Sequence, residues 1–195
     1  MSNPFLNNFL SEKDVVEKID SIKESYYTCN NKNAFFKNNQ KFDIANQVCN
    51  NIGLSDMIVY SIYIIPGTNK IYFNYPLFKN FATPENYADS QCYLQSLTTQ
   101  ILQQFDSFEM HINLASFSIS ACQRFFGAIQ SLFETTTELT DRMRILHVYN
   151  TPHVIEQIRL ILNPLINSIL PRVVYYNKRE SDQLIQNLHN EVKTT

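Results

Sequence analysis

Glycine is scarce in this sequence, and its scarcity excludes two large classes of nucleotide-binding protein. Among 195 residues there are only three glycines, which stand at the isolated positions 53, 67 and 127. P-loops and dinucleotide-binding loops hold phosphate groups with closely spaced glycines. Both fingerprints are therefore absent. The three glycines and seven prolines also exclude a collagen-like chain.

The sequence also lacks an excess of charge of either sign, and it lacks long hydrophobic runs. A formal net charge of −2 argues against a dedicated nucleic-acid-binding protein, which needs a basic surface. No run approaches the roughly 18 apolar residues of a transmembrane helix. The N-terminus shows no basic segment followed by an apolar one, so it is not predicted to be a secretory signal.

Cysteine is sparse, and its spacing bears on the cellular compartment. The four cysteines lie far apart and form no CxxC pair, so no disulfide framework is predicted. We expect reduced, mostly buried thiols in a cytoplasmic protein. With 44% hydrophobic and 13% aromatic residues, the chain is expected to form one ordinary globular domain with a modest extension. The cysteines are Cys29, Cys49, Cys92 and Cys122.

The N-terminal quarter of the chain is predicted to be helical. Ser11 is a plausible N-cap, with Asp14 at the reciprocal position of a capping box. Apolar residues then follow at spacings of three and four up to Tyr26, which is one face of a helix. A polar loop is expected over 30–40 and a short helix over 42–52. We therefore predict a helical N-terminal extension over residues 1–53 and a separate domain over 54–195.

The rest of the chain alternates between strand and helix patterns. Helices are expected after the caps at Thr83, at Ser118 or Ser120 and at Thr151, and again over 181–192. This order implies right-handed crossovers and parallel strands. The predicted fold class is α/β, with a mostly parallel five-stranded sheet, helices packed on it and the short helical extension. The five strands are predicted over 57–65, 71–73, 108–114, 145–149 and 172–176, from their β-branched and aromatic residues.

Candidate catalytic residues are few. His111 and His147 are expected in strands, where two imidazoles can bind a metal, but no cysteine or carboxylate stands at a recognisable ligand spacing. Ordinary strand histidines are the favoured interpretation. There is no GxSxG elbow, and no pair of carboxylates suggests acid–base catalysis. We expect no enzyme, no metal and no cofactor, although a small α/β enzyme using His147, His153, Asn150 and Ser118 stays open as an alternative.

The segment 152–170 is predicted to be a helix that is apolar over more than half of its circumference. Pro164 lies inside it and should kink or split it. Such a helix can be part of the core, or it can be a lid over an apolar cavity.

Four segments, in order, resemble the CRAL-TRIO family of lipid-binding domains, in particular its divergent branch that includes the BCH domains. Asn113 stands where this family usually has aspartate, and the glycine of that segment is missing. The resemblance covers more than half of the chain. The segments are 68–73 (TNKIYF), 111–120 (HINL and FSIS), 140–152 (TDRM and VYNTP) and 158–165 (IRLILNPL).

The resemblance implies an apolar pocket with the sheet as its floor and the helix over 152–170 as a mobile gate. Arg172 falls where phosphoinositide-binding members place a basic residue, and a guanidinium there could pair with a phosphate. A surface charge at a strand end is the slightly favoured alternative for Arg172. The implied floor residues are Tyr72, His111, Asn113 and Tyr149, and the implied lining residues are Phe117, Phe125, Ile155, Ile158, Leu162 and Leu165.

These implications give two functional expectations. The first is a non-enzymatic lipid-binding or lipid-transfer domain that holds a phospholipid or similar hydrophobic molecule and contacts a membrane surface transiently. The alternative is a protein-interaction module with a filled pocket, which binds a small GTPase or a GTPase regulator. Cavity volume distinguishes the two, because a ligand carrier needs an apolar cavity of several hundred Å³, in order of magnitude. No nucleic-acid partner is expected.

Overall fold

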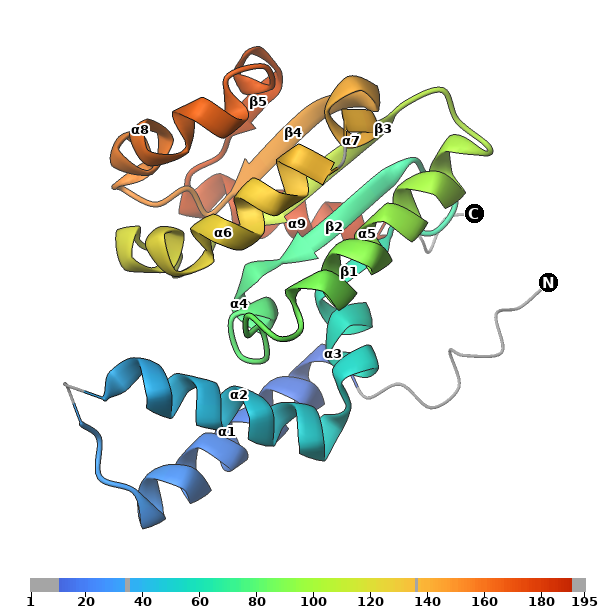
Figure 1. Ribbon diagram of the computed structural model, residues 1–195. Coiled ribbons are helices and arrows are strands. Elements are labelled where there is room, and N and C mark those ends of the chain that lie inside the picture. The colour runs from blue at the N-terminus through green and yellow to red at the C-terminus, as the bar shows by residue number, and fades with distance from the viewer. Residues whose placement is uncertain (1–10, 34–35, 136, 191–195) are drawn as a thin grey trace.

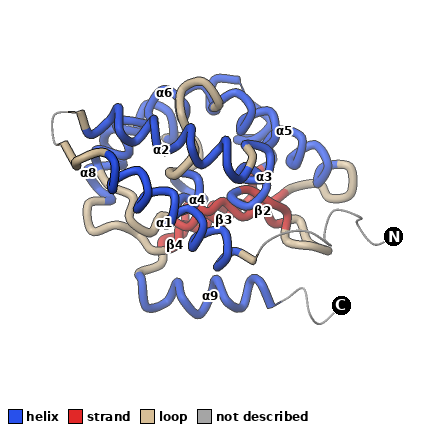
Figure 2. Tube along the Cα trace, turned by 90° about the horizontal axis from the view of Figure 1, so that it is seen from below, coloured by secondary structure: helices blue, strands red, loops and turns tan. Residues whose placement is uncertain are grey.

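The computed structural model describes residues 11–33, 36–135 and 137–190, and it has an α/β architecture. A five-stranded sheet lies between two helical layers, and the N-terminal helices lie at one end of it (Figure 1). Helices cover one face of the sheet, and a C-terminal helix covers the other (Figure 2). The first layer contains α5 (Tyr87–Leu102), α6 (Ile119–Thr135) and α8 (Ile155–Ile166), and the second contains α9 (Lys178–Asn190).

The sheet has the linear order β1-β2-β3-β4-β5. β1 is antiparallel to β2 and joined to it by the turn at Gly67, which adopts a φ of 75°. The other three pairs are parallel, which confirms the predicted α/β class with a mostly parallel five-stranded sheet. The strands are β1 (Ile62–Ile64), β2 (Lys70–Asn74), β3 (Phe108–Asn113), β4 (Met143–Tyr149) and β5 (Val173–Tyr175).

The pairing register decides which side chains share a face. Residues opposite one another in neighbouring strands form rows across the sheet, and successive rows point to opposite faces. One row faces α9 and the next faces α5, α6 and α8. The first row contains Tyr72, His111 and His147, and the second contains Phe73, Ile112 and Val148.

The predicted strand over 57–65 is mostly wrong, because α3 (Leu54–Ser61) takes up its first half. Gly53 ends the preceding helix with a φ of 106°, and its carbonyl accepts the first hydrogen bond of α3 from Met57. Met57 and Ile58 are then buried among the N-terminal helices. A short apolar run cannot be assigned to helix or strand from periodicity alone, and here tertiary burial favours the helix.

The N-terminal helices are α1 (Glu12–Cys29) and α2 (Lys37–Ile52). The predicted capping box is confirmed, because Ser11 and Asp14 exchange both of its hydrogen bonds. The predicted loop is shorter than expected, because α2 begins at residue 37. Val15 and Val48 share a core cluster with Phe81 from the α/β part of the chain, so the two predicted parts pack together. Residues 1–10 of the predicted extension lie outside the described residues.

The helices of the α/β part differ from the prediction mainly at their ends. The N-cap of α5 is Asn86, not Thr83, and α8 begins only at residue 155. Ser118 does cap α6, accepting a hydrogen bond from the Ala121 amide at 3.2 Å. α8 ends two residues after Pro164, and a 3-10 turn (Leu170–Arg172) follows. The remaining helices are α4 (Tyr75–Phe78) and α7 (Thr137–Arg142); residues 191 and 192 of the predicted last helix lie outside the described residues.

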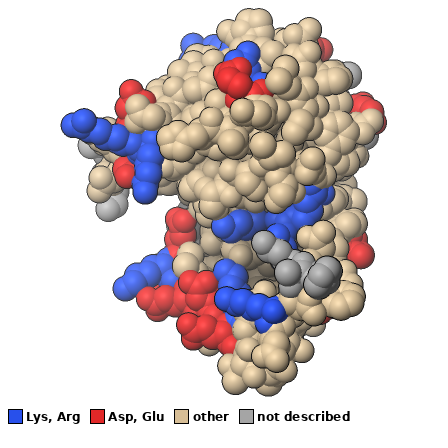
Figure 3. All heavy atoms as spheres, turned by 90° about the vertical axis from the view of Figure 1, so that its left-hand side faces the viewer, with Lys and Arg blue, Asp and Glu red and all other residues tan. Residues whose placement is uncertain are grey.

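Two further features concern the surface. Cys29 and Cys92 are exposed and only Cys122 is fully buried, so the expectation of mostly buried thiols is wrong; Cys29 ends α1 and Cys92 lies on an outer position of α5. A hollow separates the N-terminal helices from the rest of the molecule on one side, and Lys and Arg side chains gather around it (Figure 3). Among the described residues, every helix is too short or too polar to traverse a lipid bilayer.

Candidate functional site

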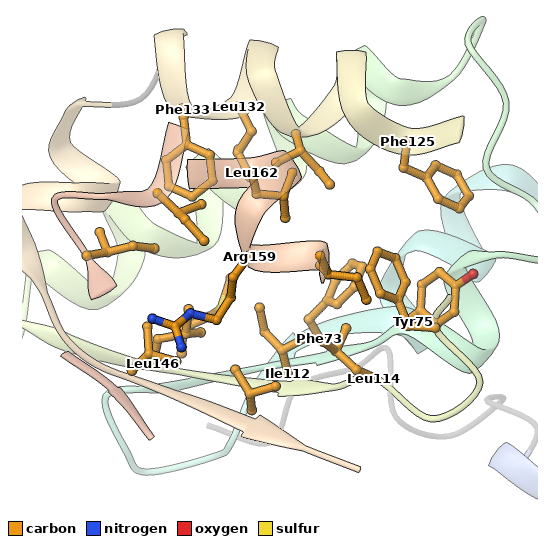
Figure 4. Close-up of a pocket in the computed structure, with 18 of the residues that line it drawn as sticks. Phe73, Tyr75, Ile112, Leu114, Phe125, Leu132, Phe133, Leu146, Arg159 and Leu162 are labelled. Carbon is orange, nitrogen blue, oxygen red and sulfur yellow. The ribbon is translucent and has the colours of Figure 1, made fainter. Parts of the chain in front are cut away.

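An apolar cavity of about 240 Å³ lies between the sheet and the layer formed by α5, α6 and α8 (Figure 4). Its floor comes from alternate residues of β2 to β5, and its roof comes from α6 and α8. The period of two along the strands and the spacing of three and four along the helices bring these side chains to one space. The floor includes Phe73, Met110, Ile112, Leu146 and Val148, and the roof includes Phe117, Phe125, Ile129, Leu132, Ile158 and Leu162.

The helix residues that the sequence singled out are brought together here. Phe117 and Phe125 line the cavity from the α6 side, and Ile155, Ile158 and Leu162 line it from α8. Leu165 does not line it but packs beside it, in a cluster with Cys122, Ile158 and Leu162. α8 therefore covers the cavity.

The expected floor residues lie on the opposite face of the sheet, so the prediction that they line the pocket is wrong. Tyr72 is buried against Leu188 of α9. The Nδ1 atom of His111 lies 2.8 Å from the Tyr149 hydroxyl on the same side. Asn113 accepts hydrogen bonds from the Ala115 amide and the Asn150 side chain, and so fixes the turn after β3. The resemblance therefore pointed to the wrong alternate positions in the strands.

The true floor carries a signal that sequence alternation could have revealed. Phe73, Ile112 and Val148 are purely apolar, whereas the residues on either side of each are tyrosine, histidine or asparagine. A ligand cavity is lined mainly by apolar groups, so the apolar series is the better choice for its floor.

The Arg172 side chain makes hydrogen bonds within the fold and does not line the cavity. Its Nη1 atom donates to the main-chain carbonyls of Thr140 at 2.7 Å and Met143 at 2.5 Å, and its Nη2 atom donates to Ser168 at 3.4 Å. These bonds tie the 3-10 turn to the start of β4. A phosphate at Arg172 would have to replace these carbonyl partners, and the geometry favours the structural alternative.

Arg159 of α8 is the charged side chain among the described residues that line the cavity, and sequence reasoning missed it. Its Nη1 atom donates to both carboxylate oxygens of Glu156, at 2.9 and 3.1 Å. Its guanidinium carbon lies 6.0 Å from the centre of the Tyr175 ring. The pair of Arg159 and Glu156 is positioned at the side of the cavity next to β5.

A second pocket, of about 300 Å³, forms the hollow seen in Figure 3, and we call it the basic groove. Lys79 donates from Nζ to the Ser116 hydroxyl at 2.7 Å. Burial lowers the pKa of Lys79, and the nearby charges of Lys23 and Arg124 lower it further. Positive charges this close together destabilise one another, so binding of an anion between them is favourable. The basic groove is lined by Lys23, Lys41, Lys79, Arg124, Tyr27, Ile44, Tyr75, Asn80, Ala121 and three serines, Ser116, Ser118 and Ser120.

The apolar cavity and the basic groove adjoin one another. Tyr75 lines both of them. On α6, Phe125 lines the cavity while its neighbour Arg124 lines the groove, and the guanidinium carbon lies 4.4 Å from the Phe125 ring centre. The Nε atom of Arg124 is buried and has no hydrogen-bond partner among the described residues. Sequence reasoning missed the groove because its four cations come from four separate segments.

Comparisons with known proteins add no information on function, so the functional argument rests on this geometry. The chain matches no model of a known protein family, and a search of curated proteins finds no match. The resemblance to CRAL-TRIO domains therefore stays a prediction.

Proposed function

We propose that this protein is a non-enzymatic lipid-binding or lipid-transfer domain, which holds a single-chain or similarly small hydrophobic ligand beneath α8. The observation that carries the proposal is the apolar cavity, whose lining contains one charged residue among those described. Its volume of about 240 Å³ lies just below the range of roughly 300–1,000 Å³ for ligand pockets. It exceeds the engineered cavity of about 150 Å³ that binds benzene. The CRAL-TRIO-like segments support the same proposal.

The adjoining basic groove suggests the polarity of the ligand. An amphiphile can lay its tail in the apolar cavity and its phosphate or carboxylate among Lys79, Arg124 and the serine hydroxyls. Each buried methylene contributes about 0.8 kcal/mol, so a tail provides affinity without any catalytic group. The anionic head then fixes the orientation by charge-assisted hydrogen bonds. This assignment moves the proposed phosphate contact from Arg172 to the groove.

α8 is the element that we propose to open. It contacts α6 through Ile158 and Leu162, which cover the cavity, while Leu160 on its outer surface is 77% exposed. When α8 moves from the sheet, a membrane surface can replace the apolar contacts that it loses, and Leu160 is placed to enter that surface. Transient membrane contact by a cytoplasmic protein follows from this proposal.

Native mass spectrometry with organic extraction tests the proposal. We expect a stoichiometric hydrophobic mass on the full chain purified from a eukaryotic host, or after incubation with phosphatidylcholine vesicles that also contain single-chain amphiphiles, oleate and lysophosphatidate. Leu162→Trp fills the cavity and should abolish this mass. Leu160→Trp makes the same change on the exposed side of α8 and should leave it. Leu132→Phe, which adds volume from α6, is a second filling variant in case Leu162→Trp misfolds.

The groove is tested in the same way. Lys79→Gln and Arg124→Gln should weaken retention of anionic ligands more than of neutral ones, whereas Lys178→Gln on α9 should not. A wild-type chain that stays free of ligand after vesicle incubation would refute the proposal. That result would favour the protein-interaction module that the sequence leaves open, and a search for a GTPase partner would follow.

A further inference from the structure

A cluster of metal-ligand side chains lies on the sheet face that α9 covers, on the other side of the sheet from the apolar cavity. Glu109 and His111 stand two residues apart in β3, and His147 is the β4 partner of His111. The Nε2 atom of His111 lies 3.5 Å from the Glu109 carboxylate, and that of His147 lies 3.7 Å from it. The three ligand atoms all lie within 4.8 Å of one another.

We propose that Glu109, His111 and His147 bind a first-row divalent transition-metal ion such as Zn²⁺. Two imidazoles and one carboxylate form a ligand set that such ions accept, and three protein ligands leave a further position open. At bond lengths of about 2.0–2.2 Å, the ligand atoms of a tetrahedral ion lie roughly 3.3–3.6 Å apart. The two nitrogen-to-oxygen separations here are already close to this spacing.

The outer hydrogen bonds of both imidazoles direct their Nε2 atoms toward the carboxylate. Nδ1 of His111 lies 2.8 Å from the Tyr149 hydroxyl, and Nδ1 of His147 lies 2.9 Å from the Tyr176 hydroxyl. Metal-binding histidines are oriented by such partners on their other nitrogen. The Nε2 atom of His111 is buried and has no hydrogen-bond partner among the described residues. A bound cation would satisfy this nitrogen.

The charge states of the three residues agree with the geometry. Burial lowers the pKa of His111 to about 4, and burial also lowers the pKa of His147, so both imidazoles are neutral near pH 7. Burial raises the pKa of the Glu109 carboxyl, but Arg144 and the two histidines together bring it below its usual value. Neutral imidazoles and an ionised carboxylate are the forms that bind metals.

Arg144 is the internal competitor for the site. Its guanidinium pairs with Glu109, and its side chain is 61% exposed, so it can leave the carboxylate for solvent. The two imidazole rings are stacked 4.4 Å apart and 14° from parallel, and metal binding would turn them toward one another. Removing the guanidinium should therefore strengthen metal binding, whereas a purely structural ion pair predicts no such gain.

Isothermal titration of Zn²⁺ into the full, chelator-treated chain tests the site. The Cys29→Ser, Cys92→Ser background removes the two exposed thiols as adventitious ligands. We expect one Zn²⁺ per chain, an affinity at least tenfold lower in His147→Asn and Glu109→Gln, and a higher affinity in Arg144→Ala. His153→Asn alters an exposed histidine and should change nothing.

Two outcomes of this titration would contradict the proposal. Zn²⁺ binding that is absent from the wild-type chain, or equal in wild type, His147→Asn and Arg144→Ala, would overturn the proposal. Circular dichroism verifies that each variant is folded, and His147, which is partly exposed, is a safer position than the buried His111. Retention of the hydrophobic ligand is measured in parallel, because the two sites lie on different faces and either can fail alone.

Discussion

The two faces of the sheet are built from the same strands but packed in different ways. Toward α5, α6 and α8 the strands present mainly aliphatic, methionine and phenylalanine side chains, with Tyr175 at one side, and leave a cavity of about 240 Å³. Toward α9 lie imidazole and phenol rings, of which His111, His147, Tyr149 and Tyr176 stand 13–15° from parallel with one another. One face therefore has room for a ligand, and the other is filled by hydrogen-bonded rings.

This difference has a physical origin in the side chains themselves. Flat rings stack closely, and hydrogen bonds such as those of His111 with Tyr149 and His147 with Tyr176 fix their orientation. Branched aliphatic side chains meet through non-directional contacts, and their packing is set by the helices that carry them. The apolar face is thus the one whose packing can change more easily, which is consistent with our proposal that α8 opens.

The largest effect is expected from placing a charge on the apolar face. Met110 of β3 is buried and lines the cavity. Met110→Asp would bury a carboxylate among apolar side chains, where Arg159 is the one cationic lining residue among those described, and we expect a loss of more than about 4 kcal/mol in the free energy of unfolding. Urea denaturation measures it. Met110→Leu conserves volume and should cost less than about 1.5 kcal/mol. A tolerated Met110→Asp would mean that water or the Arg159 guanidinium reaches the carboxylate.

A smaller effect is expected at the polar face, where hydrogen bonds and backbone geometry dominate. Asn150 follows β4 with a φ of 51°, and its side chain donates to Asn113 at 2.9 Å. Asn150→Ala loses this bond and strains the left-handed backbone, so we expect a loss of about 1–2 kcal/mol. Asn150→Gly relieves the strain but not the lost bond and should be less destabilising. Thermal unfolding of the two variants separates the contributions, and equal losses would show that strain is unimportant.

The same comparison explains what the sequence could and could not predict. Strand and helix alternation was sufficient for the parallel part of the sheet, and five of the six lining residues that the CRAL-TRIO resemblance implied do line the cavity. It was harder to predict which side chains of each strand face the cavity, because α9 buries the other face of the sheet as well. Tyrosine and histidine suit a half-buried position on either side of a sheet, so Tyr72 and His111 were assigned to the wrong one.

The sequence also could not predict features whose residues come from distant segments of the chain. The basic groove takes Lys23 from α1, Lys41 from α2, Lys79 from the end of α4 and Arg124 from α6. The carboxylate that accompanies His111 and His147 was overlooked although Glu109 stands two residues before His111, because strand geometry must be known before that spacing indicates a shared face. α3 was missed since its apolar run suits both secondary structures.

The smallest effect that we predict is a pH-dependent change in folding stability, and it arises on the polar face alone. His189 of α9 lies 2.7 Å from the Tyr63 hydroxyl and packs edge-on against the Tyr72 ring. Burial lowers its pKa, although Glu12 and the main chain of Ile185 oppose this. The unfolded chain, with an ordinary histidine pKa near 6.5, then binds the proton more readily than the folded chain. Folding stability should therefore be fully present above about pH 6.5 and decrease as the pH falls below it.

His189→Gln isolates this contribution from those of the other histidines. Glutamine keeps a hydrogen-bonding side chain at the position but does not titrate, so the variant should lose less stability than the wild type between neutral and mildly acidic pH. Urea denaturation across that range measures the difference, with a chelator present to keep the sheet histidines free of metal. Hydrophobic-ligand retention should stay constant over the same interval, because the titrating group lies on the other face of the sheet. A parallel loss of ligand and of stability would show that the two faces are coupled through the strands that they share.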